Sequence, residues 1–414
     1  MDIIVRQAAV RGRKGRWDVG IENGKISEVQ ERVSGSAELE LPANGRLLTP
    51  GYVNIHCHLD KCLTGAWADV GAGPNVGSPD VIPRATRVKE RFTQDDIVSR
   101  ASEAVKSSIL AGTTAVRAFA DVDTVGGLLA VKSLLRVKAT FKEAIDLQVV
   151  AFPQEGILRD AGTEELLEQA LELGADVVGG IPWYESTREA SEHHTDFVFD
   201  LAKRHGKDVH ALIDDTSDPG SKNIEYLLSK TIREGFKGRV AASHCRGALD
   251  SPDAAYARRV VGLAKEAGAT VVENSHVSLF MYGRTDEHPV RRGVTRVREF
   301  LEGGVNVAIG QDDIDDPYYP FGRGDMLELA LIMAHAAQLS TPEDLEKAYD
   351  MITTNPAKGM RLSGYGMQVG DEADLVLLDS TSVHEALRMQ PARLAVIHRG
   401  KLVAETKAER KLYL

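Results

Sequence analysis

Residues 51–61 read GYVNIHCHLDK and contain the short β-rich run Tyr52–His58, which ends in a His-x-His pair. In a β-strand alternate side chains lie on one face, so His56 and His58 can point the same way and chelate one metal ion. Such a pair is weak evidence by itself, because it can equally be a solvated or a core pair. Whether the pair binds a metal therefore depends on which other side chains the fold brings beside it.

Seven further β-rich runs follow, and most of the gaps between them hold a helix-like segment such as 95–110, 163–173, 224–234 or 253–267. Eight strand–helix units in series predict a closed parallel (β/α)8 barrel of the TIM type. The competing fold is an open doubly wound sheet, which the missing glycine fingerprint after the first strand disfavours. The seven runs are 114–120, 147–153, 177–182, 209–213, 240–244, 270–275 and 305–310.

The two ends of the chain have a different pattern. Residues 1–48 alternate apolar and polar positions, and Asn23-Gly24 between two such runs is a strong hairpin signal. Residues 365–414 contain three more short runs of the same kind. We therefore expect a small β-sandwich built from residues 1–48 and 365–414, and a barrel over residues 49–364.

Charge and composition exclude several classes of protein. The 414 residues carry a net charge of −11, which is wrong for a nucleic-acid binder. No apolar run is long enough for a signal peptide or a membrane span. The three cysteines fit neither a zinc finger nor a disulfide framework. A cytoplasmic protein that meets neither nucleic acid nor membrane is expected.

Other metal-binding side chains fall near the ends of later strands, which is where barrel enzymes carry their active sites. His210 follows Asp208-Val209, His244 ends the sixth run, and Asp312 follows the eighth. Each alone can be structural, but together with the His-x-His pair they predict a metal centre. Three histidines and a carboxylate suit zinc or ferrous iron.

A cation at this site lowers the pKa of bound water toward about 7 and so supplies a hydroxide nucleophile. Asp312 can bind the metal and also take the proton from the water. His244 can orient the nucleophile or stabilise developing charge, or it can be a further ligand. The fourth run has no lysine at its end to bridge two metals, which favours a single ion.

Substrate-binding residues are predicted from the same strand ends. Gln154 offers a donor and an acceptor to the edge of an amide-like ring, although it can also be a turn amide. Asp313 lies beside the predicted ligand Asp312. Trp183 can form an apolar wall, although plain packing is the commoner role of such a residue. The substrate that we expect is a small nitrogen heterocycle.

Five segments resemble bacterial cytosine deaminase, a branch of the amidohydrolase superfamily. The resemblance covers nearly the whole chain and implies a mononuclear barrel hydrolase. It implies iron or zinc on His56, His58, His210 and Asp312, with His244 beside the nucleophile and Gln154 on the substrate, in a homo-oligomer. The segments are VVAFPQEGIL (149–158), GADVVGGIPWYESTRE (174–189), RVAASH (239–244), GRTDEHPVRRGVTRV (283–297) and GQDDIDDPYYPFG (310–322).

Two positions depart from that family. The proton-shuttling glutamate three residues after the strand-five histidine is replaced by Ile213, which cannot carry a proton. One possibility is that Asp214 or Asp215 extends into the site in place of the glutamate, and we assign the catalytic role to Asp214. The other is that the mechanism does without this acid. Lys61 is similar to the lysine of the isopropylammelide-hydrolysing branch and is a candidate to bind a substrate oxygen.

Loss of the shuttle would cost a cytosine deaminase about 10²–10⁴-fold in rate. We therefore predict a metal-dependent hydrolase that cleaves a C–N bond of a heterocycle other than cytosine, by deamination or amine release. The alternatives are a ring-opening cyclic amidase of the same superfamily and a ligand-binding protein that has lost catalysis.

Overall fold

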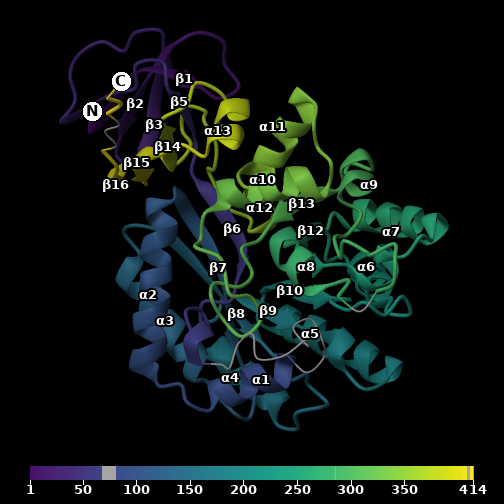
Figure 1. The fold of residues 1–414 in the computed structure, drawn as a ribbon. Coiled ribbons are helices and arrows are strands. Elements are labelled where there is room, and N and C mark those ends of the chain that lie inside the picture. Colours follow the sequence, from purple (N-terminus) through teal and green to yellow (C-terminus); the bar gives the residue numbers. More distant parts are fainter. Residues whose placement is uncertain (68–80, 285, 408–410, 414) are drawn as a thin grey trace.

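The computed structural model describes residues 1–67, 81–284, 286–407 and 411–413. Residues 68–80, 285, 408–410 and 414 lie outside the described part, including the last residues of the predicted C-terminal segment. Figure 1 shows a barrel of strands and helices, with the purple N-terminal and yellow C-terminal strands gathered beside it.

Eight parallel strands form the barrel, as predicted. They pair in strict sequence order from the first to the last, and the register is parallel throughout. The first and last strands meet where Cys57 bridges Asp312. The strands are β6 (Tyr52–Cys57), β7 (Thr113–Asp121), β8 (Asp146–Phe152), β9 (Val177–Gly180), β10 (Asp208–Ile213), β11 (Val240–His244), β12 (Thr270–Glu273) and β13 (Asn306–Ile309).

Helices cover the outside of these strands. Many begin at a side-chain cap: Thr93, for example, accepts a hydrogen bond from the backbone N–H of Asp96 at the start of α2. The helices are α1 (Val81–Lys89), α2 (Gln94–Leu110), α3 (Leu129–Phe141), α4 (Thr163–Glu172), α5 (Arg188–Arg204), α6 (Asn223–Arg233), α7 (Ala254–Ala267), α8 (Ser275–Met281), α9 (Val297–Glu302), α10 (Met326–Ala336), α11 (Pro342–Asp350), α12 (Thr354–Gly359) and α13 (Val383–Met389). Within the described ranges, no helix combines the length and the apolar character needed to cross a membrane.

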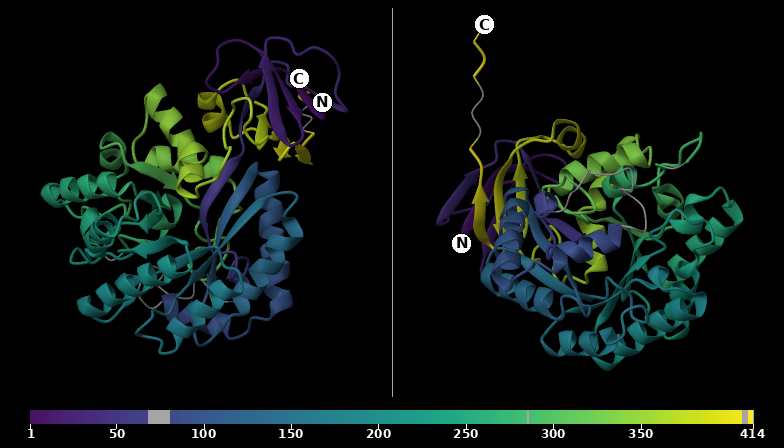
Figure 2. Two further views of the ribbon diagram at one scale, coloured as in Figure 1. Left: turned by 180° about the vertical axis from the view of Figure 1, so that it is seen from behind. Right: turned by 60° about the horizontal axis from the view of Figure 1, so that its bottom comes forward.

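The strands of the two chain ends form one further sheet. Its order is β16-β15-β14-β5-β1-β2-β3, and β4 pairs with β1. The predicted Asn23-Gly24 turn joins β2 to β3, and both residues have a positive φ, as a type I′ hairpin requires. Figure 2 shows the purple and yellow strands side by side in both views. These strands are β1 (Ile3–Val10), β2 (Trp17–Glu22), β3 (Lys25–Gln30), β4 (Leu39–Pro42), β5 (Leu47–Pro50), β14 (Leu375–Leu378), β15 (Arg393–His398) and β16 (Lys401–Glu405).

Small side chains fill one end of the barrel interior. A buried cluster that includes Ala115, Ala241 and Ala308 packs against Met360, which follows α12. Arg117 in β7 is 1% exposed and donates to the side chain of Gln148 in β8. The barrel interior is therefore packed with side chains at one end. The polar groups lie at the other end, where the carboxyl ends of the strands are.

Candidate metal centre and active site

Three predicted ligands surround one point at the carboxyl end of β6. The Nε2 atoms of His56 and His58 are 3.3 Å apart, and Asp312 Oδ1 lies 3.1 Å from the first and 3.6 Å from the second. All three side chains are buried. Closure of the barrel brings them together, because His58 N–H donates to the Asp312 carbonyl and Asp312 N–H donates to the His56 carbonyl.

His210 lies beside this group inside the barrel, but it faces Nδ1 of His56 and not the Nε2 atom that His58 and Asp312 face. It is the third residue of β10, which runs on to Ile213, so it lies inside the strand and three residues before its end. Its Nε2 lies 3.4 Å from Nδ1 of His56, and Arg117 contacts its other ring nitrogen at 3.4 Å. Burial, with its cationic neighbours, holds the pKa of His210 well below the usual value.

The charge states of the cluster suit a metal site. Burial lowers the pKa of both His56 and His58, so these imidazoles are neutral and can offer a lone pair. Burial opposes ionisation of Asp312, but His244 and His56 outweigh it and lower its pKa. Neutral imidazoles and an ionised carboxylate are the donor set that zinc or ferrous iron takes. The residues present therefore fit a divalent cation.

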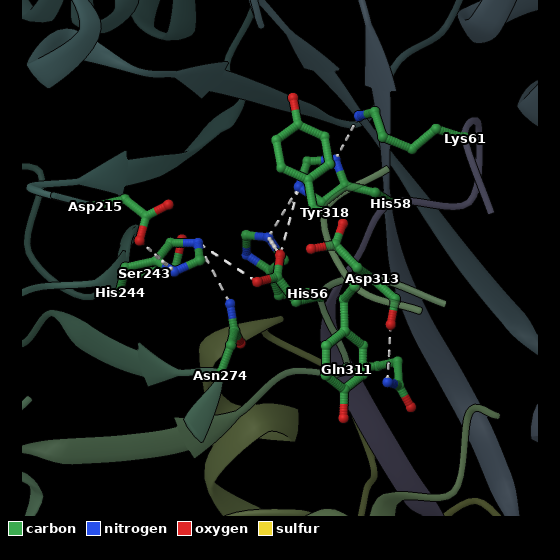
Figure 3. A network of polar contacts seen from close by, with 12 residues as sticks. His56, His58, Lys61, Asp215, Ser243, His244, Asn274, Gln311, Asp313 and Tyr318 are labelled. Atoms are coloured by element: carbon green, nitrogen blue, oxygen red, sulfur yellow. Dashed lines mark hydrogen bonds and ion pairs between the residues drawn. The ribbon is translucent and has the colours of Figure 1, made fainter. Parts of the chain in front are cut away.

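His244 links Asp312 to a second carboxylate. Its Nδ1 is 3.1 Å from Asp215 Oδ1, and its Nε2 is 3.9 Å from Asp312 Oδ2 (Figure 3). Burial alone would lower the pKa of His244, but these two carboxylates raise it above the usual value. Asp215 is in turn paired with the buried Arg246. Arg246 and His244 outweigh burial and keep the pKa of Asp215 low.

The structure does not bring the predicted catalytic residue Asp214 to this cluster. Its two carboxylate oxygens accept hydrogen bonds at the start of α6, from Ser221, from Asn223 and from the Ile224 backbone. Asp214 has a φ of 50°, a left-handed conformation that turns the chain out of strand geometry. The following residue, Asp215, is the one that faces His244.

Ile213 belongs to the large hydrophobic cluster that also contains Cys245 and Ala248. Its neighbour Leu212 packs instead with Phe119 and Phe152, the rings that lie against the histidine cluster. Within the described residues, therefore, no carboxylate takes the place of the family's glutamate on this strand.

Lys61 lies in a buried network of charged side chains. Of that network, the sequence analysis had identified Lys61 alone. Its Nζ is 3.0 Å from Nδ1 of His58, 2.8 Å from Asp121 and 3.4 Å from Asp60. The second oxygen of Asp121 is 2.9 Å from Nζ of Lys89. Lys89 also pairs with Asp123 and Glu155. We call these six residues the Lys61–Lys89 network: Asp60, Lys61, Lys89, Asp121, Asp123 and Glu155.

The remaining predicted substrate residues lie near this network with unused polar atoms. Gln154 is 4% exposed, and its side-chain amide makes no hydrogen bond within the described residues. The buried Nε1 of Trp183 and the buried hydroxyl of Tyr318 likewise have no hydrogen-bond partner there. Figure 3 shows Tyr318 and Asp313 beside His58 and Lys61. Unpaired buried donors and acceptors are costly, so these groups are candidates to bind a substrate.

A barrel with a buried histidine–aspartate cluster where its strands end is an arrangement suited to metal-dependent hydrolysis, and comparison with known proteins supplies the family. The model of the amidohydrolase family matches residues 90–404. The N-isopropylammelide isopropyl amidohydrolase of Pseudomonas sp. (strain ADP) is 32% identical over 98% of this chain and 97% of that protein. This chain belongs to the amidohydrolase family.

Solved structures agree with this assignment. The 5-methylcytosine deaminase of Klebsiella pneumoniae liganded with 5-fluorocytosine has a TM-score of 0.92 and 34% identity, over 99% of each chain. The N-isopropylammelide isopropylaminohydrolase of Burkholderia multivorans ATCC 17616 has a TM-score of 0.86 and 27% identity, over 98% of this chain and 99% of that one. The predicted resemblance is confirmed, and the chain is a hydrolase that acts on C–N bonds.

Proposed function

We propose that this protein removes an exocyclic amino or alkylamino group from a small pyrimidine- or triazine-like ring with the help of one divalent cation. One observation carries the proposal: His56, His58 and Asp312 converge on one point, with His244 beside them and unpaired polar atoms around them. The relatives named for N-isopropylammelide and 5-methylcytosine act on substituents of this kind.

We assign the cation to His56, His58, His210 and Asp312, and zinc or iron fits these donors. When bound, it would lower the pKa of water toward neutrality and polarise the attacked carbon's substituents. The lowered histidine pKa values and the ionised Asp312 support this assignment.

Proton transfer is assigned to Asp312 and His244. Asp312 takes a proton from the attacking water and delivers it to the departing nitrogen. His244, kept protonated by Asp215, donates a hydrogen bond to the attacking oxygen and so orients it. Arg246 holds Asp215 in place. In this scheme Asp215 replaces the predicted Asp214.

We assign binding of the substrate ring to the predicted substrate residues Gln154, Asp313 and Trp183. Gln154 binds one ring edge, Asp313 accepts an N–H from another, and Trp183 donates from its indole nitrogen. If His58 held the cation through Nε2, its ring proton would lie on Nδ1, which could then not accept a hydrogen bond from Lys61. Lys61 would thereby gain an N–H for a substrate oxygen.

The decisive test is an activity screen of purified, zinc- or iron-loaded protein against pyrimidines, aminotriazines, creatinine-like rings and cyclic ureas. Release of ammonia or amine from an aminopyrimidine or aminotriazine is expected, with cytosine a poor substrate because Ile213 replaces the proton shuttle. A new carboxylate in place of released amine would identify a ring-opening amidase and overturn the proposal. Light scattering would test the expected homo-oligomer.

A further inference from the structure

A buried histidine–glutamate pair lies between β9 and α5, apart from the predicted metal ligands. Nδ1 of His194, in α5, is 2.8 Å from Oε1 of Glu185, and both side chains are buried. On the other side of the ring, the backbone N–H of Ile181 donates to Nε2 at 2.9 Å. The proposed function gives this pair no role.

These two contacts determine where the proton of His194 lies. A backbone N–H can only donate, so Nε2 offers its lone pair and Nδ1 carries the proton that goes to Glu185. Burial lowers the pKa of His194, although Glu185 opposes this, so the ring stays neutral. Burial opposes ionisation of Glu185, but hydrogen bonds from His194 and from the Ile157 N–H outweigh it and lower the pKa. One neutral imidazole therefore joins a backbone donor to a carboxylate.

Glu185 extends this connection to the loop that follows β8. The same Oε1 accepts hydrogen bonds from the backbone N–H groups of Ile157, at 2.6 Å, and Leu158, at 3.2 Å. Gly156 lies directly against the carboxylate, because a Cβ at this position would be 3.0 Å from Oε1, and its φ is 87°. A residue with a side chain would be strained here, so the loop is closely fitted to Glu185.

Trp183 is in the segment that His194 holds. It is the middle residue of the short 3-10 helix η2 (Pro182–Tyr184), which Ile181 precedes and Glu185 follows. His194 contacts the residue on either side of this turn, one through each ring nitrogen. A single side chain therefore fixes both ends of the turn.

Gln154 is in the loop that Glu185 holds, three residues before Ile157. A second link between the two loops, from Arg159 to the hydroxyl of Ser186, is exposed. Exposed hydrogen bonds compete with water and contribute little. The buried pair, rather than this link, is therefore expected to set the distance between Gln154 and Trp183.

We propose that His194 is a positioning residue, which holds Trp183 and Gln154 at the spacing that a single substrate ring requires. The inference rests on the proposed function, which assigns both of these side chains to the ring. His194 itself is assigned to neither the ring nor the cation, and it acts through Ile181 and Glu185. A displacement of about 1 Å at a substrate-binding group can cost as much as about 10²-fold in rate, so a contact that prevents the displacement matters.

Kinetics with N-isopropylammelide and 5-methylcytosine, the rings in the names of two relatives, test the proposal. His194→Phe keeps a ring of similar size but removes both hydrogen bonds. We expect KM to rise at least about tenfold and kcat to change little, because Gln154 and Trp183 bind the ground state and the transition state alike. His194→Gln, whose amide can accept and donate at once, should bring KM back toward the wild-type value. An unchanged KM in His194→Phe protein, or equal KM values in the two variants, would overturn the inference.

His193→Gln is the matched control. His193 is the neighbouring residue of α5 and also contacts a glutamate, Glu164, but its side chain is 53% exposed. Its replacement should leave KM and kcat unchanged. If His194→Phe protein does not fold, Glu185→Gln takes its place, because it keeps an acceptor oxygen and loses only the charge. KM should then rise by a smaller factor, and a KM equal to that of the control would refute the inference.

Trp183 gives a readout that needs no turnover. In a chain that carries Trp17→Phe and Trp67→Phe, it is the only tryptophan. Acrylamide should quench its fluorescence more strongly in His194→Phe protein than in His194→Gln or His193→Gln protein, because the turn is then free to move. Equal quenching in all three would overturn the inference even without a substrate. A difference in quenching without turnover of any ring in the activity screen would contradict the proposed function alone.

Discussion

Replacing Lys89 by methionine tests the charge network that lies behind His58. The ammonium of Lys89 is 6% exposed and lies within 3.3 Å of Asp121, Asp123 and Glu155. Removing one partner of a buried ion pair costs about 3–5 kcal/mol, because the other charge stays buried without compensation. We expect Lys89→Met to lower the free energy of unfolding by that amount at pH 7, although methionine fills a similar volume.

The loss of stability in Lys89→Met protein should depend on pH, because Asp121 is a titrating partner of Lys89. Burial opposes its ionisation, but Lys61 and Lys89 lower the pKa of Asp121 to about 2. A carboxylate with a lowered pKa contributes stability above its unfolded pKa of about 4, and that contribution is lost as the pH falls toward 2. The difference between wild-type and Lys89→Met protein should therefore be largest near neutral pH and should shrink as the pH falls from about 4 toward 2.

Urea denaturation followed by tryptophan fluorescence measures the change. Lys106→Met is the matched control, because Lys106 pairs with Glu103 on the exposed face of α2 and such pairs are worth about 0–1 kcal/mol. If the two variants lose equal stability, or if the Lys89→Met deficit does not shrink between about pH 4 and pH 2, the buried ion pairs of Lys89 do not stabilise the folded protein.

Three further changes test the site. Asp312→Ala should reduce bound zinc, measured by elemental analysis, and lower kcat by at least about 10³-fold; an unchanged metal content would exclude it as a ligand. Asp215→Asn should lower the raised pKa of His244, so the alkaline limb of the kcat profile moves to lower pH; an unmoved limb would mean that Asp215 does not act through His244. Trp183→Phe keeps the ring but removes an N–H that has no protein partner, so KM should rise several-fold with the melting temperature unchanged, whereas a loss of stability would indicate a packing role.

The barrel strands were predictable because they are short, apolar and regularly spaced. The eight predicted runs match the eight barrel strands to within a few residues. The predicted ligands on β6 and after β13 were also found together, since closure of the barrel necessarily joins its first and last strands. The spacing of the apolar runs in the sequence is therefore enough to predict the strands and this pairing of the first and last ones.

The carboxylate that faces His244 could not be located in the same way. Alternation of side chains holds only while the backbone stays extended. Asp214, His244 and Asp312 all have a positive φ, so each strand leaves its regular geometry where the functional side chains begin. Asp214 and Asp215 are adjacent and chemically identical, yet one caps α6 and the other holds His244.

Lys89 and Arg117 were missed for another reason. A lysine near the end of a helix and an arginine in a strand suggest surface positions, because isolated charges are rarely buried. Their partners come from separate elements of the barrel, so only the folded chain shows that Lys89 is paired with Asp121 and Asp123 and that Arg117 is hydrogen-bonded to Gln148.

Because one sheet contains strands from both chain ends, it cannot be completed until synthesis is almost finished. Strand β5 ends at Pro50, but its neighbour β14 begins only at Leu375. A ribosome working at about 5–20 residues per second needs roughly 15–60 s to cover that interval. Throughout it, one side of β5 offers unsatisfied backbone groups to any passing strand, which is a risk for misassembly. Shortening the chain before β14 would make that temporary exposure permanent.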